Sequence, residues 1–233
     1  MAERPIFMPS QKTGRLVDEI SVSFIWHSGL APSQKKKNIQ ELHGAAAKRG
    51  YAPLLEVSTK SEEKLGQRLS AFNLKVELDD GGIISLECAF QGSKVFENGG
   101  PYADIFGSDS REAKRDARLT NSGKLIGFRF EGQDFPLIPK TVFYDWLYIR
   151  SLNAHRVFLE RLHRYAGFTD IEFNPLKSIN CQARSCATYV ALDRLGLLGE
   201  CVKSSDRFMR VLLPDSLEQP HSHADRQQSL LVE

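Results

Sequence analysis

Glu87, Gln91 and Lys94 are the residues of this chain whose types and spacing point most directly to chemistry. On a helix of about 3.6 residues per turn they fall at i, i+4 and i+7, so their side chains share one face. The opposite face carries small residues such as Ala89 and Gly92, which suit close packing. The three polar side chains are therefore expected to point into a cavity. The alternative is a short amphipathic helix whose charged groups are simply solvated.

A carboxyl group and an amine that face one cavity can act as an acid/base and a nucleophile, and cleavage of the N-glycosidic bond between a base and a ribose is one reaction that needs such a pair. Glu87 is the candidate acid/base that helps the base to leave, and Lys94 is the candidate nucleophile that captures the anomeric carbon as a Schiff base. Gln91, between them, would bind ribose hydroxyls. The Glu87 carboxylate favours a charged Lys94, whereas burial against Phe90 and Phe96 favours the neutral amine that a nucleophile requires. The sequence leaves that balance open.

Length and composition describe an ordinary globular chain of 233 residues, long enough for one sizeable domain with a small appendage. The formal net charge of +2 excludes a global polycation, so any contact with nucleic acid must be local. Basic clusters at 35–37, 48–49 and 111–118 are either solvated helix faces or phosphate contacts. No apolar run approaches the ~18 residues of a bilayer span, and the N-terminus lacks a signal-peptide pattern, so no membrane contact is expected.

The cysteines and histidines predict neither a disulfide framework nor a metal site. Cys88, Cys181, Cys186 and Cys201 lack zinc spacing, and they are interpreted as reduced thiols in a cytoplasmic protein. The six histidines are scattered along the chain. No metal and no cofactor is therefore expected.

Hydrophobic periodicity, turn residues and helix caps predict a mixture of helices, short strands and hairpins. Ser85 is the expected N-cap of the helix that carries Glu87, and Asn180 is the expected cap of a later helix. The stretch 203–233 is polar and contains proline, which predicts a mobile tail. The expected elements are an irregular arm at 1–18, strands at 19–26, 53–58, 74–78, 125–130, 135–138 and 168–175, and helices at 31–49, 84–96, 110–119, 141–152, 155–165 and 181–195.

Further residues are candidates for holding a nucleotide. In the turn Gly99-Gly100-Pro101-Tyr102 the backbone can approach a ligand closely. The free amides that open the helix at 181–195, helped by Arg184, would make an anion site for a diphosphate, although an ordinary solvent-capped helix end has the same pattern. Phe72 or Trp146 would stack on a purine, and packing in the core is the alternative for Trp146.

These motifs recur in one order along residues 20–200, and together they resemble the NADAR or YbiA-like N-glycosidases. That family carries a Glu-x3-Gln-x2-Lys helix behind a Ser-Asn-Phe turn and a short hairpin. Glu87, Gln91 and Lys94 match the helix one for one, and Ser-Ala-Phe-Asn at 70–73 stands for the turn.

Other segments refine the resemblance. Residues 110–114 look like the family's small helix after the site, and Asp145-Trp146 looks like its Asp-Trp helix start. Many members end with Glu-x-Ser-x2-Asp-x2-Trp-Gly, and this chain departs from that pattern at 169–184. With the segment 24–29, the departure looks like the subgroup paired with DarT-type DNA ADP-ribosyltransferase toxins.

The resemblance implies an α+β fold: a compact, mostly helical domain with short strands and hairpins, a small N-terminal βα element, and the nucleotide in a central cleft. It divides the chain into an N-terminal arm and βα element at 1–60, a catalytic domain at 61–202 and a mobile tail at 203–233. The implied activity is removal of ADP-ribose from guanine bases of ADP-ribosylated DNA, as antitoxin to a cognate ADP-ribosyltransferase toxin. Besides the catalytic pair Glu87 and Lys94, the residues expected to bind ADP-ribose are Ser70, Phe72, Asn73, Gln91, Gly99, Gly100, Tyr102, Trp146, Asp170, Glu172, Asn174, Asn180, Gln182 and Arg184.

Two other functions fit the same residues. A YbiA-like enzyme would act on small glycosylamines of riboflavin synthesis, and an assay that sets them beside ADP-ribosylated DNA separates the two. A non-enzymatic nucleotide-binding antitoxin would neutralise its toxin by contact. In that case a catalytically dead variant would still protect cells and would co-purify with the toxin.

Overall fold

The computed structural model describes residues 1–218 apart from 13–14, 30, 139–140, 156–158 and 177, and it has an α+β fold, as predicted. The described helices are α1 (Pro32–Lys48), α2 (Lys64–Arg68), α3 (Leu86–Gly92), α4 (Ser110–Lys114), α5 (Arg118–Asn121), α6 (Val142–Asn153), α8 (Gln182–Arg194), α9 (Leu198–Lys203) and α10 (Ser205–Glu218), with 3-10 helices η1 (Ala103–Gly107) and η2 (Glu160–Arg164). The described strands are β1 (Ala2–Lys12), β2 (Arg15–Phe24), β3 (Leu54–Glu56), β4 (Lys75–Glu77), β5 (Ile83–Ser85), β6 (Lys94–Phe96), β7 (Leu125–Phe130), β8 (Gln133–Phe135) and β9 (Gly167–Thr169).

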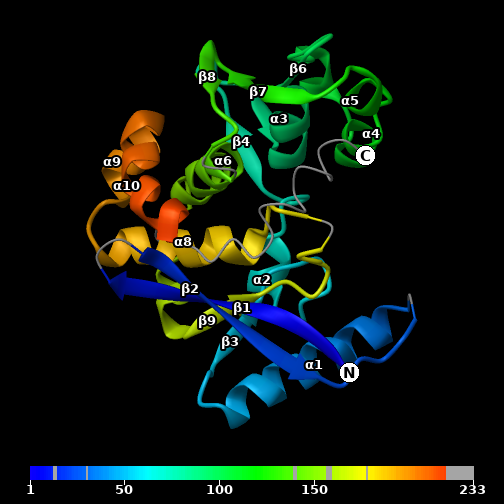
Figure 1. Cartoon of the computed structure of the whole chain (residues 1–233), viewed down its shortest axis with the longest axis vertical. Coiled ribbons are helices and arrows are strands. Elements are labelled where there is room, and N and C mark those ends of the chain that lie inside the picture. Colours follow the sequence, from blue (N-terminus) through cyan, green and yellow to red (C-terminus); the bar gives the residue numbers. More distant parts are fainter. Residues whose placement is uncertain (13–14, 30, 139–140, 156–158, 177, 219–233) are drawn as a thin grey trace.

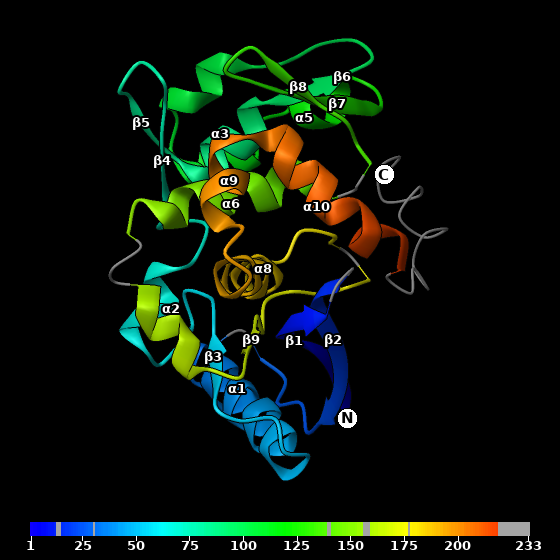
Figure 2. The same cartoon turned by 90° about the vertical axis from the view of Figure 1, so that its left-hand side faces the viewer.

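The elements are arranged in two groups with a layer of helices between them. A four-stranded sheet and α1 lie at one end of the molecule, and α3, α4, α5 and the short strands β6, β7 and β8 lie at the other (Figure 1). The helix α8 runs between the two groups and is seen end-on at the centre of Figure 2. Packing of α6 on α8 forms the main core, in which Tyr148 is fully buried and donates its hydroxyl hydrogen to the Leu69 carbonyl at 2.5 Å.

The strands β1 and β2 form a long antiparallel hairpin in which Ala2 pairs with Phe24. Phe7 on β1 is fully buried in the core. The prediction of an irregular arm at 1–18 is therefore wrong. Two prolines interrupt the local pattern of this segment, and its strand structure comes from pairing with β2, which the segment's own composition does not reveal.

Helix α1 is confirmed, and its predicted apolar stripe of Ile39, Leu42 and Ala46 is buried. The sheet order is β2-β1-β9-β3, with β1 antiparallel to both β2 and β9 and with β3 parallel to β9. The strands β2 and β3, which precede and follow α1 in the chain, consequently run in the same direction, as in the predicted βαβ-like element. They are not neighbours, because β1 and β9 lie between them.

The hairpins β4–β5 and β7–β8 confirm the predictions at 74–85 and 125–138. Glu131 and Gly132 both have positive φ in the second hairpin, which is the backbone of a tight two-residue turn. The helix predicted at 110–119 is instead two short helices, α4 and α5. The chain breaks between them where the Asp116 carboxylate accepts a hydrogen bond from the Arg118 amide at 2.9 Å.

The C-terminal part also differs from the prediction. Residues 205–218 form α10, in which Phe208 and Leu212 are buried. The prediction of a mobile tail from 203 onwards is therefore wrong for this segment. Residues 219–233 lie outside the described residues. Within 155–165 the described residues 160–164 form the 3-10 helix η2. None of the described helices combines the length and apolar character that a bilayer crossing needs.

Candidate active site

Glu87 and Gln91 lie on α3, a helix whose residues are all buried. The Ser85 hydroxyl accepts a hydrogen bond from the Cys88 amide at 3.1 Å, which confirms the predicted N-cap. The Gln91 amide donates to the Glu87 carboxylate at 2.8 Å, and each residue is only 6% exposed. The other amide atom, Gln91 Oε1, is buried without a hydrogen-bond partner among the described residues. Since buried polar atoms normally find partners, this oxygen is a candidate ligand contact.

Lys94 does not lie on the helix as predicted, because α3 ends at Gly92 and Lys94 opens strand β6. Two contacts with β7 cause the change: Lys94 pairs with Phe128, and the Ser93 carbonyl accepts a hydrogen bond from the Arg129 amide at 2.7 Å. Cross-strand pairing therefore ends the helical repeat one turn early. Lys94 is nevertheless close enough to Glu87 for the two charges to interact.

The Lys94 amine is held in an apolar environment beside one carboxylate. Its Nζ atom lies 5.1 Å from the ring centroid of Phe90. Burial lowers the pKa of Lys94 to about 8, although Glu87 raises it, and Lys114 lowers it further. Desolvation therefore outweighs the effect of the Glu87 charge on the pKa of Lys94, which the sequence had left open. About a tenth of such an amine is neutral at pH 7, and most of it is neutral above pH 8.

Three more predicted residues lie near one another where the turn at 70–73 meets the first turn of α8. Gln182, in the first turn of α8, accepts a hydrogen bond from the Ala71 amide at 2.8 Å and donates to Asp170 at 3.1 Å. Ser70 precedes Ala71 in the same turn, and its hydroxyl is a second buried polar atom without a described partner. The structure therefore brings Ser70, Asp170 and Gln182 together.

Asp170 is a buried carboxyl group that follows strand β9. Burial, with the nearby Glu56 carboxyl group, raises the pKa of Asp170 to about 8, so the group is largely protonated at neutral pH. Burial also raises the pKa of Glu56, whose carboxylate accepts hydrogen bonds from the hydroxyls of Ser58 and Thr169 at 2.6 and 2.7 Å. This network anchors β9, and with it Asp170, to β3.

A comparison with protein families matches residues 2–222 to the DarT1-associated NADAR antitoxins. The chain belongs to this family. Membership confirms the resemblance drawn from Glu87, Gln91 and Lys94, gives the chain an antitoxin role in a DarT system, and implies a cognate DarT toxin as partner. A search of curated proteins finds no match to the chain.

Tyr144 lies beside the candidate site of this NADAR antitoxin, and sequence reasoning did not identify it. Its ring packs edge-on against Phe90 at 5.3 Å, and it is buried. Burial, with the charges of Glu87 and Asp170 among others, holds the pKa of Tyr144 well above its usual value, so the hydroxyl stays protonated. Periodicity could not reveal it, because nearly every position of α6 is buried and the helix has no polar face.

Other predicted residues of the NADAR antitoxin already have protein partners. Glu172 is exposed and pairs with Lys35 on α1 at 3.0 Å, and the Asn174 side chain accepts from the Leu176 amide. Arg184 pairs with Asp145 at 2.8 Å. Asn180 is not the cap of α8; that position belongs to Cys181, which makes no side-chain cap hydrogen bond.

The glycine turn and Trp146 have structural explanations. A Cβ atom on Gly99 would lie 2.3 Å from the Tyr102 hydroxyl, and one on Gly100 would lie 2.2 Å from the Lys94 carbonyl, so the close backbone approach is to the protein itself. The Tyr102 hydroxyl is within 2.5 Å of the Ser122 hydroxyl. Trp146 is a core residue rather than a stacking platform, because its ring packs on Phe135 at 5.2 Å and is 5% exposed.

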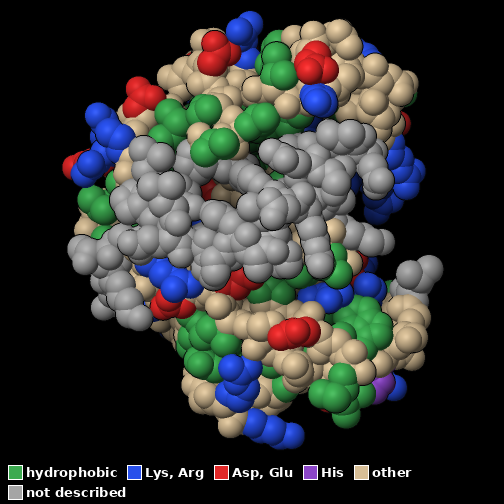
Figure 3. Space-filling view, in the orientation of Figure 1, with side chains coloured by type: hydrophobic (Ala, Val, Ile, Leu, Met, Phe, Trp, Pro, Cys, Tyr) green, Lys and Arg blue, Asp and Glu red, His purple; other side chains and the backbone are tan. Residues whose placement is uncertain are grey.

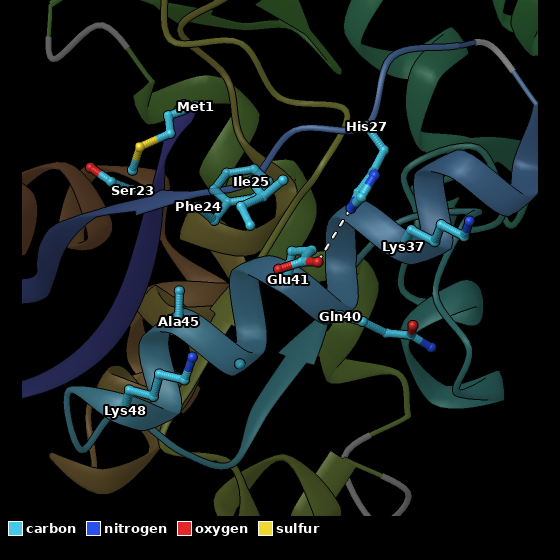
Figure 4. Close-up of a pocket in the computed structure, with 11 residues that line it drawn as sticks. Met1, Ser23, Phe24, Ile25, His27, Lys37, Gln40, Glu41, Ala45 and Lys48 are labelled. Atoms are coloured by element: carbon cyan, nitrogen blue, oxygen red, sulfur yellow. Dashed lines mark hydrogen bonds and ion pairs between the residues drawn. The ribbon is translucent and has the colours of Figure 1, made fainter.

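Several cavities open on the described part of the NADAR antitoxin, and Trp146 lines one of about 280 Å³. Phe72 and Asn73 line one of about 510 Å³ beside α4. Another, of about 700 Å³, lies between the end of β2 and α1, where His27 pairs with Glu41 at 3.2 Å, and it contains none of the predicted site residues (Figure 4). Among the described residues, no cluster of three or more histidine, cysteine or acidic side chains could hold a metal ion. The four cysteines are buried and free.

Proposed function

We propose that this antitoxin is an N-glycosidase that removes ADP-ribose from guanine bases of DNA. The observation that carries the proposal is the pair on α3 and β6: the buried Glu87 carboxyl group lies close to a half-buried amine, Lys94, which desolvation makes largely neutral above pH 8. The association of the NADAR family with glycosidase chemistry supports the same reaction.

In the proposed reaction the neutral Lys94 amine attacks the anomeric carbon of the ADP-ribose that is attached to guanine. The carbon–nitrogen bond breaks, and its electron pair moves to the guanine nitrogen. Glu87 carries a proton from the attacking amine to that nitrogen, so the guanine leaves neutral. The sugar ring then opens to a Schiff base on Lys94. Water adds to this Schiff base, and free ADP-ribose and the amine are released.

Two of the polar atoms proposed to hold ADP-ribose, on Gln91 and Ser70, lack hydrogen-bond partners among the described residues. The buried Gln91 oxygen would accept a hydrogen bond from a ribose hydroxyl, and the Ser70 hydroxyl would make a second such contact. Tyr144 and the protonated Asp170 would act as neutral donors close to the diphosphate or ribose. Neutral groups suit this task, since charged carboxylates would repel the diphosphate.

The experiment that tests this function offers the purified protein two substrates side by side. We expect release of ADP-ribose from a single-stranded oligonucleotide that carries one ADP-ribosylated guanine, and no turnover of a small glycosylamine of the riboflavin type. Turnover of the glycosylamine alone would reassign the substrate. If neither is hydrolysed while the protein still protects cells from the toxin, neutralisation by contact replaces the enzymatic function.

The dependence of the rate on pH should follow Lys94. Because only the neutral amine attacks, kcat/KM is expected to rise with pH and to level off above about 8. Lys114 lowers the pKa of Lys94, so Lys114→Met should move the midpoint of this rise to higher pH. The measurement uses ADP-ribosyl-deoxyguanosine, which avoids effects on DNA binding. A profile that is flat from about pH 6 to 9, or a midpoint that Lys114→Met leaves in place, would contradict the assignment.

A further inference from the structure

The cavity beside α4 combines positive charge with an exposed aromatic ring. Arg111, Lys114 and Arg115 line it, all three are exposed, and neither arginine makes an ion pair with a described residue. Phe72 also lines the cavity and is 39% exposed, with the Lys114 amine 5.6 Å from its ring centroid. The cavity also contains Asp109, whose carboxylate caps α4. Its side chains still carry a net charge of +2, from three cations and one anion.

This cavity is attached rigidly to the candidate active site. The Ser110 hydroxyl at the start of α4 donates to the Ser85 hydroxyl, the N-cap of the helix that carries Glu87, at 2.8 Å. Ala113 of α4 packs in a small buried cluster with Cys88 of α3. Lys114 lies between the two sites, because its charge lowers the pKa of Lys94 and its amine lies over the Phe72 ring. Figure 3 shows basic side chains gathered at the edge of the molecule where Figure 1 places α4.

The chemistry of the cavity matches a single nucleic-acid strand. Aromatic rings that stack on bases, set among cations that contact phosphates, are the usual means of holding unpaired strands. A guanine that enters a buried site must leave the base stack, so its neighbours in the strand are unpaired or distorted. The residues proposed to hold ADP-ribose are buried, whereas Arg111 and Arg115 face outward, towards the DNA that remains in solvent.

We propose that this cavity binds the DNA strand next to the modified guanine, with Phe72 stacked on the neighbouring base and Arg111 and Arg115 on its phosphates. This inference rests on the proposed function for its orientation, because it assumes that the modified base lies at Glu87 and Lys94. It makes the enzyme selective for ADP-ribosylated DNA over the ADP-ribosylated nucleoside.

The test compares the double variant Arg111→Ala/Arg115→Ala with wild type on two substrates. With a single-stranded oligonucleotide that carries one ADP-ribosylated guanine, kcat/KM should fall about tenfold, and the slope of log kcat/KM against log salt should become shallower by roughly 1.4, about 0.7 for each lost phosphate contact. With ADP-ribosyl-deoxyguanosine, kcat/KM should not change. Equal losses on both substrates would assign the cavity to ADP-ribose, and no loss on either would remove it from the binding surface; both results overturn the proposal.

Two controls sharpen the result. Lys36→Ala/Lys48→Ala removes two exposed cations from α1, at the other end of the molecule, and should leave the oligonucleotide rate and its salt slope unchanged (Figure 1). Phe72→Ala should weaken binding of an unmodified oligonucleotide, measured by fluorescence anisotropy, about fivefold or more without changing the salt slope. Anisotropy needs no turnover. If wild type hydrolyses neither substrate, the proposed function fails, and loss of oligonucleotide binding in the arginine variant still decides whether the cavity binds DNA.

Discussion

Replacement of Lys94 by alanine is expected to abolish release of ADP-ribose from modified DNA, with a loss of more than about 10³-fold in kcat, as for the removal of a nucleophile in other covalent enzymes. The variant also removes the covalent intermediate. Borohydride added during turnover should therefore reduce a Schiff base on the wild-type protein and give a stable adduct with the mass of ADP-ribose. Lys94→Ala should give none.

The matched control for this experiment is Lys75→Ala, since Lys75 is an exposed lysine in β4 with no role in the proposed chemistry. It should keep wild-type kcat and should leave the adduct on the same peptide, the one that contains Lys94. Thermal unfolding of Lys94→Ala shows whether the variant is folded, so that a loss of activity can be separated from a loss of structure. Turnover near the wild-type rate by a folded Lys94→Ala protein, or an adduct on another lysine, would reject the nucleophile.

Glu87→Gln is expected to lower kcat by about 10²- to 10⁴-fold, the usual contribution of a general acid/base. The substitution keeps the size of the side chain and leaves an oxygen that can accept the hydrogen bond from Gln91, so the helix should stay intact. Glutamine cannot carry a proton from the amine to the departing base. The borohydride adduct should consequently form slowly rather than disappear.

The pH dependence of the residual activity of Glu87→Gln provides a second test of the Glu87–Lys94 pair. Because the Glu87 charge raises the pKa of Lys94, its removal should shift the rising limb of the pH profile below the wild-type midpoint of about 8. A purely structural role for Glu87 would lower the rate without that shift. The matched measurement on Lys114→Met should move the limb in the opposite direction, so the two variants test one electrostatic arrangement from both sides.

Local sequence patterns predicted much of the fold. The helix α1 begins at Pro32 and has a clear apolar stripe, and the hairpins turn at glycines with positive φ, such as Gly81 and Gly132, so both are local features. The strand β1 and the end of α3 are not local. Pairing with β2 makes a strand of 2–12, and pairing with β7 takes Lys94 out of the helix. Contacts between distant segments cannot be read from either segment alone.

In the candidate site, too, local features could be predicted from the sequence, whereas contacts between distant segments could not. The spacing of Glu87 and Gln91 predicted that the two side chains share a face of the helix, and the hydrogen bond between them confirms this. The surroundings of Lys94 and the resulting pKa depend instead on Phe90 packing among Phe128, Phe143 and Tyr144. The contact between Gln182 and Asp170 joins the first turn of α8 to a loop, and no spacing rule predicts it. The polar composition and the prolines of 203–233 predict a mobile tail and hide α10, in which Phe208 and Leu212 have helical spacing.

The position of β9 inside the N-terminal sheet limits how this chain can be divided. Three residues from the second half of the sequence lie between β1 and β3, and they lead directly to Asp170. A fragment that begins at residue 61 would leave both edges of β9 without partners and would strip the Glu56 carboxyl group from Thr169. Unpaired edges promote association between chains, so such a fragment should aggregate. Residues 1–60 therefore hold Asp170 in place through β9, and we expect the described part of the chain to fold as a single unit.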